Sequence, residues 1–209
     1  MLNLLELNLK EDYHIHSNFN DHSPDNLTIS NIVDQAEKIG LEKFAITEHV
    51  RKTSDWIPEY LEQIKSLNRK NLIVGFEAKI LPDGSINCPQ EYMKNYFIIA
   101  SFHGLFKDKK QWIKALESAI QNPDVNVIGH LGPEPTFDLT EDELIHLSKL
   151  IVSNNKIVEI NAKYHLPLLT WVKIFKKNGV KFHLSSDAHS LSEIGDFKKI
   201  SDLIEIIND

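Results

Sequence analysis

Short runs of apolar residues recur along the chain and alternate with amphipathic segments whose apolar positions repeat every three to four residues. Most of the short runs are almost continuously apolar, which is typical of parallel strands covered on both faces. Seven of them predict strands: Asp12–Ser17, Lys43–Thr47, Leu72–Ala78, Tyr96–Phe102, Val125–Gly129, Ile157–Asn161 and Val180–Ser185.

The amphipathic segments between these runs predict helices. Thr140 stands three residues before Glu143, which is the spacing of a capping box, and Gly40 and Gly179 fall where helices should end. The link after the third strand looks like a turn and a short excursion, with at most a short helix at Gln90–Lys94. Six longer helices are predicted: Thr28–Ile39, Pro58–Asn68, Lys109–Gln121, Glu141–Asn154, Pro167–Lys177 and Leu191–Ile207.

Strands that alternate with helices through short links predict an α/β fold with a parallel sheet. Seven strands without a glycine-rich dinucleotide motif favour a (β/α)7 TIM-like barrel, closed or nearly closed, over an open sheet. The chain has 209 residues and no repeat, linker or low-complexity tract, so one domain spanning residues 1–209 is expected.

The ten histidines of the chain are unevenly placed, and most fall at predicted strand ends. The carboxyl ends of the strands of a parallel barrel share one mouth, and that mouth carries the chemistry. Nine candidate ligands, one of them in the first loop, should therefore meet there: His14, His16, His22, His49, Glu77, His103, His130, Asp187 and His189.

The spacing of these residues favours metal binding. His14 and His16 are two residues apart, so on a strand their side chains share a face, and Asp187 and His189 repeat this spacing. Imidazole and carboxylate ligands suit zinc, manganese or iron, and a carboxylate such as Glu77 can bridge two ions. The three remaining histidines are interpreted as structural or as supporting the ligands: His146, His165 and His183.

The composition narrows the choice of partners. The net charge is −7, with 23 lysines and arginines, which argues against extensive nucleic-acid binding but not against a phosphate in a pocket. Lone Cys88 excludes an internal disulfide and suits a reducing compartment. No signal peptide or membrane-spanning run is recognised, so we expect a cytoplasmic protein without membrane contact. The sequence does not indicate an oligomeric state.

Seven motifs follow one another in the order found in one known family: Asp12-Tyr-His-Ile-His16, Ile46-Thr-Glu-His49, Gly75 to Gly84, Ala100-Ser-Phe-His103, Ile128-Gly-His130, Glu159-Ile-Asn161 and Ser185-Ser-Asp-Ala-His189. Together they resemble the PHP (polymerase and histidinol phosphatase) family, over a range from Asp12 to Phe197.

The resemblance implies a distorted seven-stranded barrel and a site for two to three divalent ions. One ion would take His14, His16, Glu77 and Asp187; a second would take Glu77, His103 and His130; a third would take His22, His49 and His189. The implied activity is hydrolysis of a small phosphomonoester, as in histidinol phosphatases, by a hydroxide that bridges metals.

Four residues are candidates for catalytic roles: Glu77, Asp187, Arg51 and Glu48. Arg51 or Lys79 could bind the substrate phosphate, with Lys107 and Lys163 as weaker candidates, and Glu48 could orient a ligand or accept a proton.

Other activities remain open. In PHP domains attached to family X polymerases, Pro-Thr-Gly-Arg follows the fifth-strand histidine, whereas this chain has Leu131-Gly-Pro-Glu134. The missing arginine makes a 3′-end or oligonucleotide phosphodiesterase or exonuclease the second choice. A non-catalytic metal-binding domain ranks lower, as does an amidohydrolase, which commonly needs a bridging lysine after the fourth strand, where this chain has His103.

Overall fold

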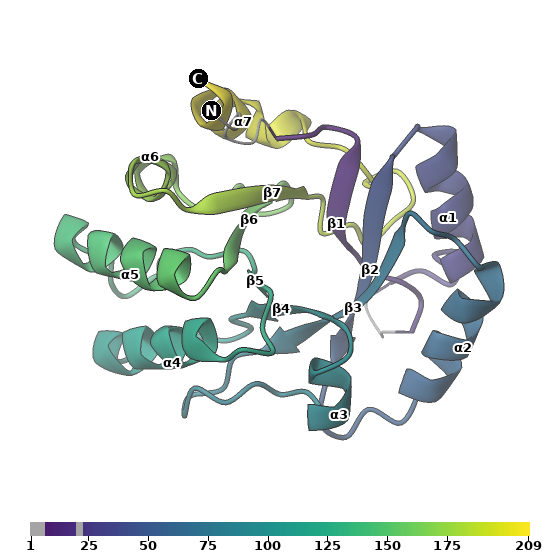
Figure 1. Cartoon of the computed structure of the whole chain (residues 1–209), viewed down its shortest axis with the longest axis horizontal. Coiled ribbons are helices and arrows are strands. Elements are labelled where there is room, and N and C mark those ends of the chain that lie inside the picture. Colours follow the sequence, from purple (N-terminus) through teal and green to yellow (C-terminus); the bar gives the residue numbers. More distant parts are fainter. Residues whose placement is uncertain (1–6, 20–22) are drawn as a thin grey trace.

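In the computed structural model, which describes residues 7–19 and 23–209, seven parallel strands pair in chain order into one sheet (Figure 1). The sheet curls round into a nearly closed barrel with interleaved helices, as predicted. The strands are β1 Glu11–Ile15, β2 Lys43–Val50, β3 Leu72–Lys79, β4 Phe97–Ser101, β5 Val127–Ile128, β6 Ile157–Asn161 and β7 Lys181–Ser185.

The barrel closes where β1 meets the segment that follows β7. Ile15 and Ala188 form a single parallel bridge. The His16 N–H donates to the Ala188 carbonyl at 2.9 Å, and the Ala188 N–H donates to the His14 carbonyl at 3.3 Å. The buried Asp12 carboxylate adds a second link across this seam, since it accepts backbone hydrogen bonds from residues 186 and 195 at 2.9 Å each.

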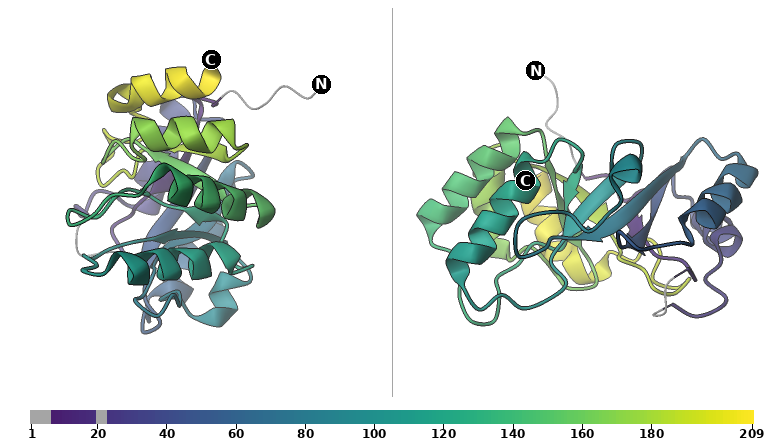
Figure 2. Two further views of the ribbon diagram at one scale, coloured as in Figure 1. Left: turned by 90° about the vertical axis from the view of Figure 1, so that its left-hand side faces the viewer. Right: turned by 90° about the horizontal axis from the view of Figure 1, so that it is seen from below.

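Helices cover the outside of the barrel. Figures 1 and 2 show α4, α5 and α6 stacked side by side along one side, with α1 and α2 packed on the other. The large apolar side chains lie between these helices and the strands, so the polar residues of the strands are turned into the barrel. The helices are α1 Ile29–Lys38, α2 Ile57–Leu67, α3 Gln90–Met93, α4 Lys109–Gln121, α5 Glu141–Ser153, α6 Leu169–Lys177 and α7 Ser201–Asn208.

The structure corrects several predicted boundaries. Strand β2 runs three residues further than expected, so that Glu48 and His49 lie in the strand, and β5 is only two residues long. The helix predicted over Leu191–Ile207 is wrong for its first part, where turns precede a short 3₁₀ helix at Lys198–Ile200 and α7. Gly195 has φ +69°, which is not a helical conformation, and its N–H donates to Asp12. Both features hold this part of the chain against the seam and prevent a helix there.

The predicted capping box at the start of α5 is present, since Thr140 accepts from the Glu143 N–H and Glu143 accepts from the Thr140 N–H. Across the described ranges, no helix is long and apolar enough to cross a bilayer.

Candidate metal centre

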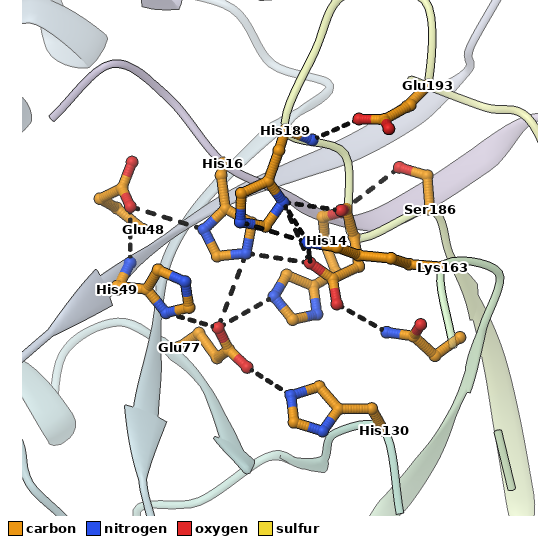
Figure 3. A network of polar contacts seen from close by, with 12 residues as sticks. His14, His16, Glu48, His49, Glu77, His130, Lys163, Ser186, His189 and Glu193 are labelled. Atoms are coloured by element: carbon orange, nitrogen blue, oxygen red, sulfur yellow. Dashed lines mark hydrogen bonds and ion pairs between the residues drawn. The ribbon is translucent and has the colours of Figure 1, made fainter. Parts of the chain in front are cut away.

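The strand ends bring eight of the nine predicted ligands together at the mouth of the barrel. Figure 3 shows His14, His16, His49, Glu77, His130 and His189 of this set turned toward one another. Chain segments from β1, β2, β3, β4, β5 and β7 each supply at least one of them. His22 lies outside the described residues. The eight are His14, His16, His49, Glu77, His103, His130, Asp187 and His189.

Glu77 lies at the centre of this cluster and is only 2% exposed. Its Oε1 is 2.9 Å from Nε2 of both His103 and His130. Its Oε2 is 2.7 Å from Nδ1 of His49 and 3.4 Å from Nε2 of His14. Because each carboxylate oxygen faces imidazoles from two different strands, Glu77 has the geometry of a bridging ligand.

Two buried imidazole nitrogens in the cluster lack a hydrogen-bond partner among the described residues: Nε2 of His14 and Nε2 of His16. The neighbouring carboxylate oxygens lie 3.3 to 3.6 Å from these imidazole nitrogens, which is long for a charge-assisted hydrogen bond. A buried polar atom without a partner costs free energy, which a metal bond would recover. The donor set therefore fits divalent cations.

The ligand atoms fall into three overlapping groups, each with all atoms within 4.8 Å of one another. Two groups, His14–His16–Asp187 and His49–Glu77–His103, combine imidazoles with a carboxylate, and the third is His16, His49 and His189. The family pattern assigns His49 with His189 to one ion and Glu77 with His103 to another. The observed grouping places His49 close to both pairs.

Glu159, in the middle of β6, is completely buried beneath the ligands. Its Oε1 lies 2.6 Å from Nδ1 of His14, and its Oε2 accepts hydrogen bonds from the His130 N–H and, at 3.2 Å, from Asn161 Nδ2. A carboxylate on the far nitrogen of a ligand histidine fixes the orientation of the ring. Glu159 lies in one of the seven motifs, but no role was predicted for it, although a carboxylate inside an apolar strand is a detectable signal.

Glu48 is also buried, and it contacts both backbone and side-chain groups of the ligand-bearing segments. It accepts hydrogen bonds from the Ser17 N–H at 2.8 Å, the Ser17 hydroxyl at 2.6 Å and the His49 N–H at 2.8 Å, and its Oε1 lies 3.5 Å from Nδ1 of His16. These contacts hold the two ligand-bearing segments together. Of the two predicted roles, orienting a ligand suits this geometry better than accepting a proton.

Two ligand positions have a left-handed backbone, with φ +23° at His130 and φ +54° at Asp187. Each such residue costs on the order of 1–3 kcal/mol and persists only when its surroundings hold it in place. Asn161 holds Asp187 from below, since its Nδ2 donates to Asp187 Oδ2 at 3.1 Å. At these two positions the backbone strain lies where side chains are aimed into the cleft, while Asn68, Asn155 and His165 carry a left-handed backbone elsewhere.

The pKa values of the clustered side chains are shifted in different directions, and His14 and His16 have raised values. Burial lowers the pKa of His14, but Glu159, Glu77 and Asp187 outweigh it and raise the pKa well above 6.5. His16 follows the same pattern, with burial opposed by Asp187 and Glu48, and its pKa rises to about 9.

The carboxylates and the outer imidazoles shift in the opposite direction. Burial raises the pKa of Glu77, but the surrounding histidines, His14 first, hold it well below its usual value, and the pKa of Asp187 is lowered in the same way. Burial lowers the pKa of His49, and that of His189 to about 4. These two imidazoles are therefore neutral at pH 7, as ligands must be.

A cavity of about 1000 Å³ opens over the ligands. Lys163 lines it, with its Nζ 2.8 Å from Nδ1 of His189 and 3.5 Å from Oδ1 of Asp187. Arg51 and Lys79 also line the cavity, whereas Lys107 is exposed and does not.

The three histidines interpreted as structural lie elsewhere. His146 pairs with Glu117 on the surface at 2.8 Å, and His165 pairs with Asp202 at 2.8 Å. His183 is buried inside the barrel and stacks on the Tyr13 ring with centroids 4.7 Å apart.

Residues 12–163 match the model of the PHP domain, which is more than half of the chain. The chain belongs to the PHP domain family. The PHP domain is similar to a "Probable phosphatase" of Acetivibrio thermocellus, with 27% identity over 94% of this chain and 86% of the relative. It is 31% identical to a "Probable phosphatase" of Caldicellulosiruptor bescii, over 90% of this chain and 82% of the relative.

Solved structures show the same fold. The PHP domain superposes on the crystal structure of the "putative histidinol phosphatase" of Listeria monocytogenes with a TM-score of 0.71, at 15% identity, covering 89% of this chain and 97% of that one. A chain in a cryo-EM structure of archaeal ribonuclease P with mature tRNA gives 0.54, at 14% identity, covering 94% and 90%. At these identities the likeness concerns the fold alone.

Proposed function

We propose that this PHP domain is a metal-dependent phosphatase that hydrolyses small phosphomonoesters. The observation that carries the proposal is the convergence of unpartnered buried ligand atoms around Glu77, directly beneath a cavity that cations line. The relatives named probable phosphatases, which align over almost the whole chain, support the same reaction class.

The proposed centre holds two to three divalent ions, with zinc, manganese and iron all suited to these donors. When bound, such ions supply Lewis acidity, since they polarise the phosphoryl group and lower the pKa of coordinated water to roughly 7. The described residues that would hold them are the eight clustered ligands, with His22 as the ninth.

The side chains of the cleft have different proposed roles in holding the ions and the substrate. Glu77 and Asp187 hold charge at the centre of the cluster, while Glu159 and Glu48 fix the rings and backbone of the ligands. Among the described cations of the cavity, Lys163 is the one whose Nζ contacts the side chains of proposed ligands, so we assign the phosphoryl oxygens to it. Arg51, the first choice from the sequence, contacts none of the ligands and is assigned a different role below.

Several features support a small substrate over a long nucleic acid. The cavity of about 1000 Å³ would hold a metabolite-sized ester. The net charge of −7 opposes extended contact with a polyanion. The loop after His130 carries Glu134 and no arginine, so it offers no cation to a nucleic-acid backbone. Because the Listeria protein is named a putative histidinol phosphatase, histidinol phosphate belongs among the esters to test.

The test compares metal-stripped protein with protein loaded with manganese, zinc or iron on a panel of phosphomonoesters and on single-stranded DNA. Loaded protein should release inorganic phosphate from small esters, and stripped protein should not. Glu77→Gln should abolish the release, while His146→Gln, at an exposed histidine far from the cleft, should leave it unchanged. Degradation of DNA without any phosphomonoester turnover would overturn the proposal.

A further inference from the structure

Two cations stand just outside the ligands on one wall of the cavity. Strands β2 and β3 pair in register, with His49 opposite Glu77 and Val50 opposite Ala78, and the next residues along the two segments are Arg51 and Lys79. Two residues of extended chain span about 6 to 7 Å. Arg51 and Lys79 therefore lie side by side, one such step from two metal ligands, and both line the cavity.

The chain holds these two cations in place through Asn87. Its N–H donates to the Lys79 carbonyl at 2.9 Å, and its Oδ1 accepts from the Lys52 N–H at 3.1 Å. Arg51 and Ser54 close the loop, since the Arg51 N–H donates to Ser54 Oγ and the Ser54 N–H donates to the Arg51 carbonyl, both at 3.0 Å. The excursion after β3 thus fixes the Arg51 loop against Lys79.

The two cationic groups differ in their hydrogen-bond partners. Lys79 Nζ donates to the His103 carbonyl at 3.0 Å, which uses one of its three protons and keeps it at the cavity wall. The Arg51 guanidinium has no hydrogen bond or ion pair with any residue that the structure describes. It is left to bind something in the cavity.

The balance of charge in the cavity points to an anion at this wall. Lys163, which is assigned to the ester phosphate, contacts Asp187 and His189, two of the proposed metal ligands. Apart from Glu77 and Asp187, which bound metals would neutralise, the only carboxylate among the described lining residues is the exposed Asp55. Lys163 and the bound metals would already neutralise a single phosphate, so the positive charges of Arg51 and Lys79 are left for another anionic group.

We propose that Arg51 and Lys79 form a second anion-binding subsite, so that the substrate carries a phosphate or carboxylate group in addition to its ester phosphate. This inference rests on the proposed phosphatase function and narrows its substrate class. A guanidinium can bind such a group through two parallel hydrogen bonds, and the ammonium adds a point charge. A substrate with a cationic body, such as histidinol phosphate, would meet repulsion at this wall.

Equilibrium binding of non-hydrolysable phosphonates to metal-loaded protein tests the subsite without relying on turnover. Propylphosphonate, 3-phosphonopropionate and 3-aminopropylphosphonate share a three-carbon body and differ only in a neutral, anionic or cationic end. Calorimetry should rank the anionic ligand about tenfold tighter than the neutral one, and the cationic ligand weakest. Propane-1,3-bisphosphonate distinguishes a second phosphate from a carboxylate.

Two variants locate the effect. Arg51→Gln should remove most of the preference for 3-phosphonopropionate while binding of propylphosphonate stays within about twofold of wild type. Lys52→Gln is the matched control, since Lys52 is an exposed neighbour that does not line the cavity, and it should keep the preference. Metal content measured in each variant excludes an indirect effect through the ligands.

Equal affinity for the three phosphonates in the wild type would overturn the subsite, as would an unchanged preference in Arg51→Gln. Tightest binding of the amine would also overturn it and would direct attention to Asp55. A preference that depends on Arg51, in a protein that hydrolyses no phosphomonoester, would leave the subsite standing and remove the proposed function. Hydrolysis of phosphomonoesters without a preference for the anionic phosphonate would leave the proposed function standing and remove the subsite.

Discussion

Nδ1 of His14 lies 2.6 Å from Oε1 of Glu159, with both side chains completely buried. The short contact holds the proton on Nδ1, so that Nε2 is the nitrogen left for a metal. This Nε2 is one of the two buried unpartnered imidazole nitrogens of the cluster. Glu159 therefore prepares His14 for coordination without touching the ion itself.

The first prediction concerns this contact. Glu159→Gln keeps the size of the side chain but removes the charge that orients His14, so metal affinity and phosphatase activity should fall by roughly 10- to 100-fold. Metal titration and turnover on one sample measure both effects. Glu117→Gln is the matched control, because Glu117 makes a 2.8 Å contact with His146 on the surface. Unchanged metal affinity in Glu159→Gln would show that the ring of His14 is held by packing alone.

The second prediction concerns Glu77. Its two oxygens face imidazoles from four strand ends, so Glu77→Gln removes a charge that more than one ion would share. Activity should fall by orders of magnitude and bound metal should decrease, while circular dichroism shows an intact fold. Turnover near the wild-type rate, with full metal content, would rule out a bridging role.

The third prediction concerns pH and the metal-free protein. The pKa of His16 is about 9 in the folded state against 6.5 unfolded, and that of His14 is raised in the same direction. Their protonation therefore stabilises the fold fully below pH 6.5, and this contribution is lost as the pH rises toward 9. The free energy of unfolding of stripped protein, from urea titrations, should fall between pH 6.5 and 8.5.

Metal-loaded protein provides the control for this effect. Coordinated imidazoles are already neutral across that range, so its stability should not show the same fall. A flat profile for the stripped protein, or an equal fall for both forms, would contradict the assignment of His14 and His16 as metal ligands.

The fourth prediction concerns Lys163. Its Nζ contacts His189 and Asp187 at the edge of the cavity, and we assign it to the phosphoryl group. Lys163→Met should lower kcat/KM for small esters by about 10- to 100-fold, since a hydrogen bond to a charged group is lost. Lys163→Arg should restore part of the rate. Lys107→Met, at an exposed lysine outside the cavity, should behave as wild type, and equal loss in both methionine variants would remove the assignment.

Much of the barrel could be predicted because its strands are nearly continuous apolar runs, and all of them except β6 carry a predicted ligand at or just after their carboxyl end. The positions of His14, His103 and His130 depend only on where those runs end. The contact between Glu159 and His14 joins β6 to β1, which are not neighbours in the sheet, and no local pattern reports such a distance.

The helix predicted for the segment before α7 was wrong for a related reason. Residues 191–196 have helical composition, but Gly195 bonds to Asp12, which is 183 positions earlier in the chain. A tertiary contact of this kind overrides local propensity. The role of residues 81–89 could not be predicted for the same reason. Asn87 links the loop after β2 to the end of β3 through hydrogen bonds that no local sequence pattern indicates.

The seam between β1 and the segment after β7 has a consequence for biosynthesis. The cleft draws His14 and His16 from the first strand and Asp187 and His189 from just beyond the last one. During translation, the chain emerges from the ribosome in sequence order. The eight clustered residues therefore cannot assemble until residue 189 has left the exit tunnel, and a nascent chain that carries only the early histidines cannot yet form the proposed metal centre.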